Sequence, residues 1–199
     1  MKDTVARALV EAGVVRFGDF TLTSGKKSPI YVDLRVLPSH PVCFDEITGQ
    51  MADAVRSICP KRLAGAETAG IPIAAVLSIK CALPMVYVRK KPKSHGTKSQ
   101  IEGIIEKDDS VLLVDDMVTD GGSKVAFIEA IRKEGGVVTD AIVILDRGQG
   151  GAENLTEHNV KLHCLITLDE LLDYMESEDL IEADMFDLVK RYLSEKDAK

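Results

Sequence analysis

The amino-acid sequence predicts an α/β fold with a central, mostly parallel sheet flanked by helices. Short apolar runs typical of buried strands alternate with segments whose apolar residues recur at helical spacing. Two of these runs lead through a glycine-containing turn directly into a helix, at residues 66–72 and 115–123. Strands that alternate with helices form parallel sheets covered on both faces, and ligands bind beyond the carboxyl ends of such strands.

The predicted elements follow one another without an internal repeat. A helix over residues 3–12 precedes a hairpin over Phe17–Arg35, where apolar and polar residues alternate around Ser24-Gly25. The periodicity then predicts helices over 41–57, 71–81 and 125–134, and strands over 63–66, 85–89, 111–114, 137–145 and 162–165. From residue 167 to the C-terminus the apolar residues recur at helical spacing, and we interpret them as packing surfaces.

Length and composition fit one globular domain. The chain has 199 residues, of which 45% are hydrophobic and 29% are charged, and a chain of this size buries a substantial core. No apolar run approaches the ~20 residues of a membrane span, and the first helix lacks the apolar core of a signal peptide. We therefore expect a cytoplasmic protein without a membrane partner. The net charge of -7 argues against nucleic-acid binding and means that an anionic ligand needs a local basic site.

The hairpin carries residues suited to an anionic ligand. Ser24 and Gly25 can form a tight turn that brings backbone N–H groups to a ligand. Lys26 and Lys27 add positive charge, and Tyr31 offers an aromatic ring face. The alternative is a surface hairpin with two solvated lysines, which composition alone favours.

The segment Ala66–Pro72 is a strand–turn–helix junction, with Gly70 at the turn and Pro72 near the helix start. Its backbone N–H groups are suited to hold a pyrophosphate. Taken alone, however, a Gly-Ile-Pro sequence is usually only a turn.

Positive charge is concentrated between Arg89 and Gly103. Five Lys or Arg residues and one His fall in this segment of an otherwise acidic chain. Because it has little apolar content, we expect a mobile loop that does not pack. Such a loop suits closure over a polyphosphate, where it excludes water and neutralises a leaving group. The candidate residues are Arg89, Lys90, Lys93 and His95, the last two as proton donors. A solvated charged surface is the alternative.

Residues 111–123, VLLVDDMVTDGGS, carry the most information about function. A buried strand ends in Asp115 and Asp116, and a turn made of Thr119, Asp120, Gly121, Gly122 and Ser123 leads into a helix. Glycines and the free N–H groups of a helix start cradle a phosphate. The two carboxylates would repel a bare phosphate, but they accept hydrogen bonds from sugar hydroxyls or attract a divalent metal. A sugar 5-phosphate with free 2- and 3-hydroxyls satisfies both halves. The alternative is an ordinary strand–loop–helix junction.

Two further features bear on chemistry. Arg147 follows the last long strand in the sequence LDRGQGG, where its planar guanidinium could grip a carboxylate through two hydrogen bonds. An exposed arginine in a glycine loop is an equal alternative. The four cysteines are widely spaced and form no CxxC pair, which favours buried free thiols over a zinc site or a disulfide framework. They are Cys43, Cys59, Cys81 and Cys164.

Over nearly the whole chain these segments resemble the orotate phosphoribosyltransferases, type I enzymes that use phosphoribosyl pyrophosphate (PRPP). FTLTSGKKSPIYVDLR is similar to the N-terminal hood of that family, and RKKPKSHG to its catalytic loop. VLLVDDMVTDGGS is similar to its PRPP loop, and LDRGQGG to the segment with its orotate-binding arginine. The resemblance implies one phosphoribosyltransferase domain over residues 1–199, with residues 1–40 as a hood over the active site.

The resemblance also implies a reaction, a cofactor and a partner. The enzyme would transfer the phosphoribosyl group of PRPP to orotate in UMP biosynthesis, with Mg²⁺, and would act as a homodimer whose catalytic loop reaches the neighbouring site. Asp115 and Asp116 would hold the ribose hydroxyls, residues 119–123 the 5-phosphate, and Arg147 the orotate carboxylate. The hood residues Ser24, Gly25, Lys26 and Tyr31 would meet PRPP and orotate. The alternatives are a phosphoribosyltransferase for another base and a non-catalytic PRPP-binding regulator.

The chain departs from the pattern of the bacterial members at three positions. Thr23 and Ala69 stand where those members carry lysine, and Asp120 stands where threonine is commoner. PRPP binding is therefore expected to depend more on Mg²⁺, on the mobile loop and on the backbone of residues 119–123.

Overall fold

The centre of the molecule is a six-stranded sheet. The computed structural model describes residues 2–21, 25, 27–92 and 99–197. The strand order is β5-β4-β3-β6-β7-β8, and the strands are β3 Arg62–Ala66, β4 Met85–Val88, β5 Ile101–Glu102, β6 Ser110–Val118, β7 Val137–Asp146 and β8 Lys161–Thr167. Five of them are parallel, and β5 pairs antiparallel with β4 at the edge. The mostly parallel sheet predicted from the strand–helix alternation is confirmed.

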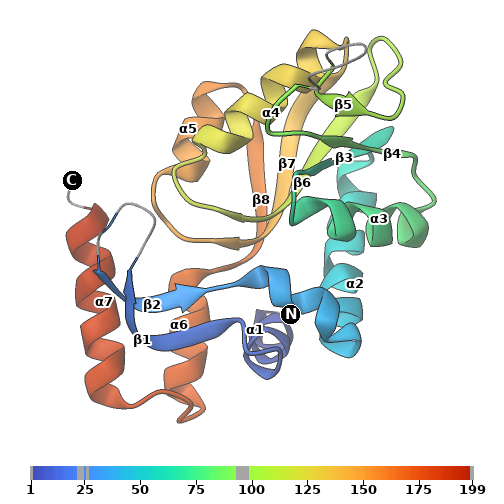
Figure 1. Ribbon diagram of the computed structural model, residues 1–199. Coiled ribbons are helices and arrows are strands. Elements are labelled where there is room, and N and C mark those ends of the chain that lie inside the picture. The colour runs from blue at the N-terminus through green and yellow to red at the C-terminus, as the bar shows by residue number, and fades with distance from the viewer. Residues whose placement is uncertain (1, 22–24, 26, 93–98, 198–199) are drawn as a thin grey trace.

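Helices cover both faces of this sheet (Figure 1). The helices on one face are α4 Gly122–Lys133 and α5 Gly151–Glu157, and those on the other are α1 Lys2–Glu11, α2 Pro41–Ile58 and α3 Gly70–Cys81. Residues 111–114 of strand β6 form an unbroken apolar run, and their packing explains it. Leu112 and Val114 pack into one hydrophobic cluster, and Val111 and Leu113 into the other. Because successive side chains of a strand point to opposite faces, residues 111–114 are apolar where both faces of β6 are covered.

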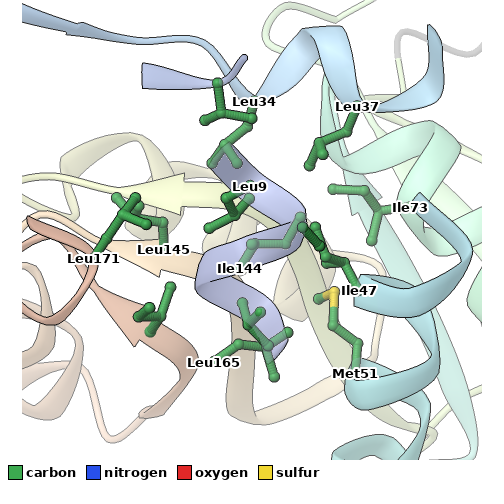
Figure 2. Packing of buried hydrophobic residues seen from close by; sticks show 14 of the residues in the cluster. Leu9, Leu34, Leu37, Ile47, Met51, Ile73, Ile144, Leu145, Leu165 and Leu171 are labelled. Atoms are coloured by element: carbon green, nitrogen blue, oxygen red, sulfur yellow. The ribbon is translucent and has the colours of Figure 1, made fainter. Parts of the chain in front are cut away.

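The larger hydrophobic cluster joins the two ends of the chain. Figure 2 shows Leu9 of α1, Ile47 of α2 and Ile144 of β7 close together, with Leu171 nearby. All four are 0% exposed. Leu171 belongs to helix α6, Leu168–Ser177. The N-terminal helix and the C-terminal region thus share one core, which fits a single cooperative unit.

The predicted hairpin is present as β1 Val15–Thr21 and β2 Lys27–Val32, and a 3₁₀ helix, η1 Leu34–Ser39, follows it. The predicted C-terminal helical region divides into α6 and α7, Ala183–Asp197. Helix α6 begins with a capping box in which Thr167 and Glu170 bond to each other's backbone N–H. Helix α7 packs beside β2 of the hairpin (Figure 1).

Three local predictions are wrong. Strand β6 does not end at Val114: it pairs with β7 as far as Val118, because ladder hydrogen bonds continue regardless of the two acidic side chains. The basic segment packs at its C-terminal end, since Ile101 is buried and forms β5. Cys59 and Cys164 are exposed rather than buried, although all four cysteines are free. Helix α5 was not predicted from its short polar sequence. None of the described helices has the length and apolar content to cross a bilayer.

Candidate active site

The candidate site lies at the carboxyl ends of β3 and β6. From β3 the chain continues to β4 on one side, and β6, β7 and β8 extend the sheet on the other. The strand order therefore reverses between β3 and β6, and ligands of open α/β sheets bind in the crevice at such a point. The two predicted strand–turn–helix junctions both begin here, one between β3 and α3 and the other between β6 and α4.

A cavity of about 360 Å³ opens between these junctions. It brings together the end of the hairpin, the turn after β3, the start of the basic segment, the acidic pair and the first turns of α4. The lining residues are Val32, Arg35, Glu67, Thr68, Ala69, Lys90, Asp115, Asp116, Met117, Ser123, Lys124 and Phe127. A larger cavity of about 580 Å³ lies between α1 and α6. That cavity contains none of the predicted residues, so we assign the site to the smaller one.

Close backbone packing fixes the two junctions relative to each other. A Cβ atom added to Gly70 would lie 2.3 Å from the Val114 carbonyl oxygen and 3.1 Å from Asp115 Cα. Gly70 is therefore required by the close approach of α3 to β6, not by turn conformation alone. The Glu67–Thr68 peptide bond in the first junction is cis.

The two carboxylates of the acidic pair have different surroundings. Asp115 is buried, with Oδ2 2.5 Å from Lys124 Nζ and Oδ1 accepting from the Asp116 N–H at 2.9 Å. Asp116 Oδ1 accepts from the Met117 N–H at 2.7 Å. Burial, and then the adjacent Asp115 carboxylate, raise the pKa of Asp116 to about 6. A buried cation thus neutralises one acid, whereas the other is easily protonated.

Lys124 was not among the predicted site residues. The sequence carried a signal for it, because Lys124 falls at helical spacing with Phe127, Ile128 and Ile131, which are all buried. A lysine on the buried face of a helix needs an acidic partner, and the acidic pair lies on the buried strand that precedes this helix.

The glycine turn 119–122 forms the start of α4. Gly121 has φ +80° and lies at the N-cap position, a conformation that favours glycine. Asp120 Oδ1 accepts from the Gly122 N–H at 3.0 Å, and the Asp120 carbonyl accepts from Asn154 Nδ2 at 2.6 Å. One N–H of the predicted phosphate cradle is therefore already used by Asp120. Of the turn and its flank, Ser123 lines the cavity, whereas Thr119, Asp120, Gly121 and Gly122 do not.

The 3₁₀ helix η1, which follows the hairpin, contributes Arg35, which sequence reasoning did not select. Arg35 Nε donates to Asp33 Oδ1 at 2.6 Å, and Nη2 donates to the Tyr31 hydroxyl at 2.8 Å. The Tyr31 ring lies 5.4 Å from that of Phe20. Tyr31 thus supports the arginine at the cavity wall and does not line the cavity itself. Gly25 is exposed with φ +79°, while Thr23, Ser24 and Lys26 lie outside the described residues.

The basic segment reaches the cavity through Lys90. The Lys90 N–H donates to Glu67 Oε2 at 2.6 Å. Arg89 Nη1 lies 3.4 Å from Glu102 Oε1, on the side of β5, and Arg89 does not line the cavity. Lys93 and His95 lie outside the described residues, so the structure does not test their predicted roles.

Arg147 lies beside the glycine turn, at the end of β7. Its backbone N–H donates to the Val118 carbonyl at 3.1 Å. Burial lowers the pKa of Arg147, and its Nε has no hydrogen-bond partner within the described ranges. A half-buried arginine whose Nε donor is buried and unused is suited to an anionic ligand. Arg147 is not part of the 360 Å³ cavity, so any group that its side chain binds lies outside that cavity.

A mostly parallel sheet, a small N-terminal hairpin sheet and two glycine junctions at the switch point are the architecture of type I phosphoribosyltransferases. The family model described as "Phosphoribosyl transferase domain" matches residues 37–179. The chain is 41% identical to orotate phosphoribosyltransferase of Methanopyrus kandleri, over 89% of this chain and 95% of that protein. The chain belongs to the phosphoribosyltransferase family and, within it, to the orotate phosphoribosyltransferases.

Solved structures agree with this placement. UMP synthase of Leishmania donovani matches with a TM-score of 0.87 and 34% identity, over 98% of this chain and 42% of that one. Orotate phosphoribosyltransferase of Mycobacterium tuberculosis, crystallised with PRPP, matches with a TM-score of 0.70 and 25% identity, over 85% of this chain and 98% of that one.

Proposed function

We propose that the protein transfers the 5-phosphoribosyl group of PRPP to orotate, giving orotidine 5′-phosphate and pyrophosphate in UMP biosynthesis. The observation that supports the proposal best is the grouping of Asp115, Asp116 and Ser123 on the wall of one cavity. Arg147 follows β7 directly, and its backbone N–H donates to the Val118 carbonyl just before the glycine turn. An anion-binding arginine next to a ribose-phosphate site fits a base that carries a carboxylate. The Methanopyrus relative bears the name of this activity, and the Mycobacterium structure holds PRPP.

Each part of the site then has a role. Asp115 and Asp116 hold the ribose hydroxyls, the backbone and hydroxyls of residues 119–123 hold the 5-phosphate, and Arg147 binds the orotate carboxylate. Arg89, Lys90, Lys93 and His95 serve the departing pyrophosphate. Residues 1–40, including Ser24, Gly25, Lys26 and Tyr31, form the hood of a single domain that spans residues 1–199.

The reaction forms a bond from the anomeric carbon to the orotate ring nitrogen as the bond to the pyrophosphate oxygen breaks. Positive charge develops on the ribose, and negative charge on the leaving group. The protein accelerates this exchange by holding the two reactants in line and by placing cations around the pyrophosphate. In the described part of the site, Arg35 and Lys90 lie on the cavity wall where they can supply that charge.

The donor set fits Mg²⁺ held mainly by substrate. Three carboxylates line the cavity, those of Glu67, Asp115 and Asp116, but the described residues contain no cluster of three or more potential metal ligands. Mg²⁺ commonly keeps several waters and takes phosphate oxygens as ligands. When bound, the ion would neutralise part of the pyrophosphate charge, and Asp115 and Asp116 would hold the ribose hydroxyls.

We further propose a cytoplasmic homodimer in which the segment that follows Lys90 serves the neighbouring subunit's site. The basic composition of residues 89–98 supports this role, since the charge is concentrated on one segment of the sequence. Lys90, near the start of that segment, lines the cavity.

The direct test is the loss of orotate absorbance on addition of PRPP and Mg²⁺. Turnover of a purine base in place of orotate would assign the protein to another base. Binding of PRPP without turnover of any base would indicate a regulator. Thermal unfolding adds an independent readout. With pyrophosphate present, orotate at 100 times its own Kd should add ~2.7 kcal/mol to the free energy of unfolding.

A further inference from the structure

Lys124 is a buried lysine at the wall of the candidate site. It lies in the first turns of α4 and is 7% exposed. Its Nζ lies 2.5 Å from Asp115 Oδ2, and the two side chains are 9% and 8% exposed. Both residues line the 360 Å³ cavity. The pair is therefore shielded from water yet faces the space that the substrate would occupy.

A buried ion pair of this kind contributes little net stability to a fold. Removing two charges from water is costly, and apolar residues of similar size are often as stable or more stable in its place. Lysine is almost never buried unless it is paired. The position of the pair on the cavity wall, rather than within either hydrophobic cluster, favours a role in the site.

The pair makes the two acids unequal. Lys124 and the Asp116 N–H engage both oxygens of Asp115. In the described part of the chain the only backbone group bonded to the Asp116 carboxylate is the Met117 N–H. Asp115 is thus fixed in one orientation as an anion, and Asp116 is the less constrained acid.

The charges on the cavity wall indicate what the Lys124–Asp115 pair does. The lining contains three cations, Arg35, Lys90 and Lys124, and three acids, Glu67, Asp115 and Asp116. Arg35 is already bonded to Asp33, and Lys90 is exposed to solvent. Without Lys124, two neighbouring carboxylates would face the cavity with no buried cation between them, and they would repel a polyphosphate.

We propose that Lys124 is a positioning residue of the reaction: its ammonium group pairs with Asp115 and holds that carboxylate in one orientation, so that the acidic pair accepts ribose hydroxyls beside a polyanionic substrate. The inference rests on the proposed function, because it needs a substrate with both sugar hydroxyls and phosphates. Lys124 acts through Asp115 and makes no contact with the reacting atoms.

The test combines Lys124→Met with Asp115→Asn, singly and together, and uses Lys133→Met as a matched control. Lys133 is an exposed lysine in the last turn of α4. Lys124→Met should weaken PRPP binding about tenfold or more, as measured by calorimetry and by KM, while the KM for orotate changes less than about threefold. In the Asp115→Asn background the same substitution should change PRPP affinity less than about threefold, because the residue through which it acts is already altered.

Two results would overturn the proposal. One is a folded Lys124→Met protein with unchanged PRPP affinity; the other is an equal loss in both backgrounds, which would mean that Lys124 acts without Asp115. If Lys124→Met does not fold, Lys124→Gln takes its place, because glutamine keeps a donor for Asp115 without the charge. Calorimetry with PRPP needs no turnover, so a failure of orotate transfer would appear in the wild-type protein and leave this comparison readable.

Discussion

The Glu67 carboxylate accepts a hydrogen bond from the Lys90 N–H at 2.6 Å, joining two walls of the candidate site. Glu67 follows β3 and Lys90 follows β4, which are neighbouring parallel strands. The Glu67 N–H also donates to the Val88 carbonyl at 2.9 Å. The turn proposed to hold pyrophosphate and the start of the basic segment are therefore fixed to each other by one side chain.

Glu67→Ala should release the start of the basic segment. A hydrogen bond to a charged group contributes roughly 1.5–3 kcal/mol, so we expect kcat to fall by about tenfold and the Lys90 amide to exchange faster with deuterium. Glu67→Gln keeps an oxygen acceptor, so its kcat should fall much less than that of Glu67→Ala. Equal exchange rates at Lys90 in the wild type and Glu67→Ala would contradict this role.

Gly70→Ala should displace α3 from the acidic pair. The added Cβ would lie 2.3 Å from the Val114 carbonyl oxygen, so we expect a loss of about 3 kcal/mol or more in the free energy of unfolding, together with weaker PRPP binding. Gly49→Ala is the control. Gly49 lies in α2 and a Cβ there meets nothing within 4 Å, so that substitution should add ~0.5–1 kcal/mol. Chemical denaturation of both variants checks the contrast.

Asp116→Asn should stabilise the protein at pH 8. The pKa of Asp116 is about 6 in the folded state, against an ordinary value of 3.8. The folded state therefore binds more protons than the unfolded chain, and this group's contribution to stability increases as the pH falls from about 7 to about 4. Above that window ionised Asp116 costs up to about 3 kcal/mol, which asparagine removes.

The measurement is the free energy of unfolding from pH 4 to pH 8 for both proteins. The stability of the wild type relative to Asp116→Asn should increase as the pH falls, by up to about 1 kcal/mol per pH unit within the window. Parallel stability curves would show that Asp116 does not have a raised pKa. Orotate turnover of the variant should drop at every pH, since asparagine is a weaker acceptor for ribose hydroxyls.

Arg147→Lys should weaken orotate binding specifically. Lysine keeps the charge but loses the planar fork that grips a carboxylate in two places, so we expect the KM for orotate to rise by about tenfold or more while the KM for PRPP changes little. Arg191→Lys, an exposed substitution in α7, serves as the control. If only the KM for PRPP rises, Arg147 belongs to the phosphate site and not to the orotate site.

Hybrid dimers test whether sites are shared. Lys93→Ala should lower kcat strongly without unfolding the protein, and Asp115→Ala should disable the ribose site. If the basic segment acts in the neighbouring subunit, mixing the two inactive proteins should restore roughly a quarter of wild-type activity, since half of the dimers then hold one intact site. Mixtures that stay inactive despite subunit exchange would favour self-contained sites.

The sequence predicted the fold and the two halves of the ribose-phosphate site because both depend on local patterns. Apolar runs such as 111–114 and helical spacing such as 125–131 specify strand and helix wherever they occur. Asp115 and Asp116 adjoin the glycine turn in the chain, so their proximity needed no tertiary information. The extent of β6 was not predicted. Its hydrogen-bond ladder continues to Val118, but the polar side chains of Asp115 and Asp116 interrupt the apolar pattern that predicts a buried strand.

Other residues reach the site only through the fold. Arg35, Glu67 and Lys124 lie on three separate elements and meet because β3 and β6 are neighbours at the switch point. Tyr31, whose ring is predicted to face a ligand, accepts a hydrogen bond from Arg35 through its hydroxyl. Alone, the sequence determined most of the elements and the neighbourhood of Asp115, Asp116 and the glycine turn, and it predicted a ribose-phosphate site there. The tertiary structure decided which acid is neutralised, because charge pairing depends on distances across elements that local patterns do not encode.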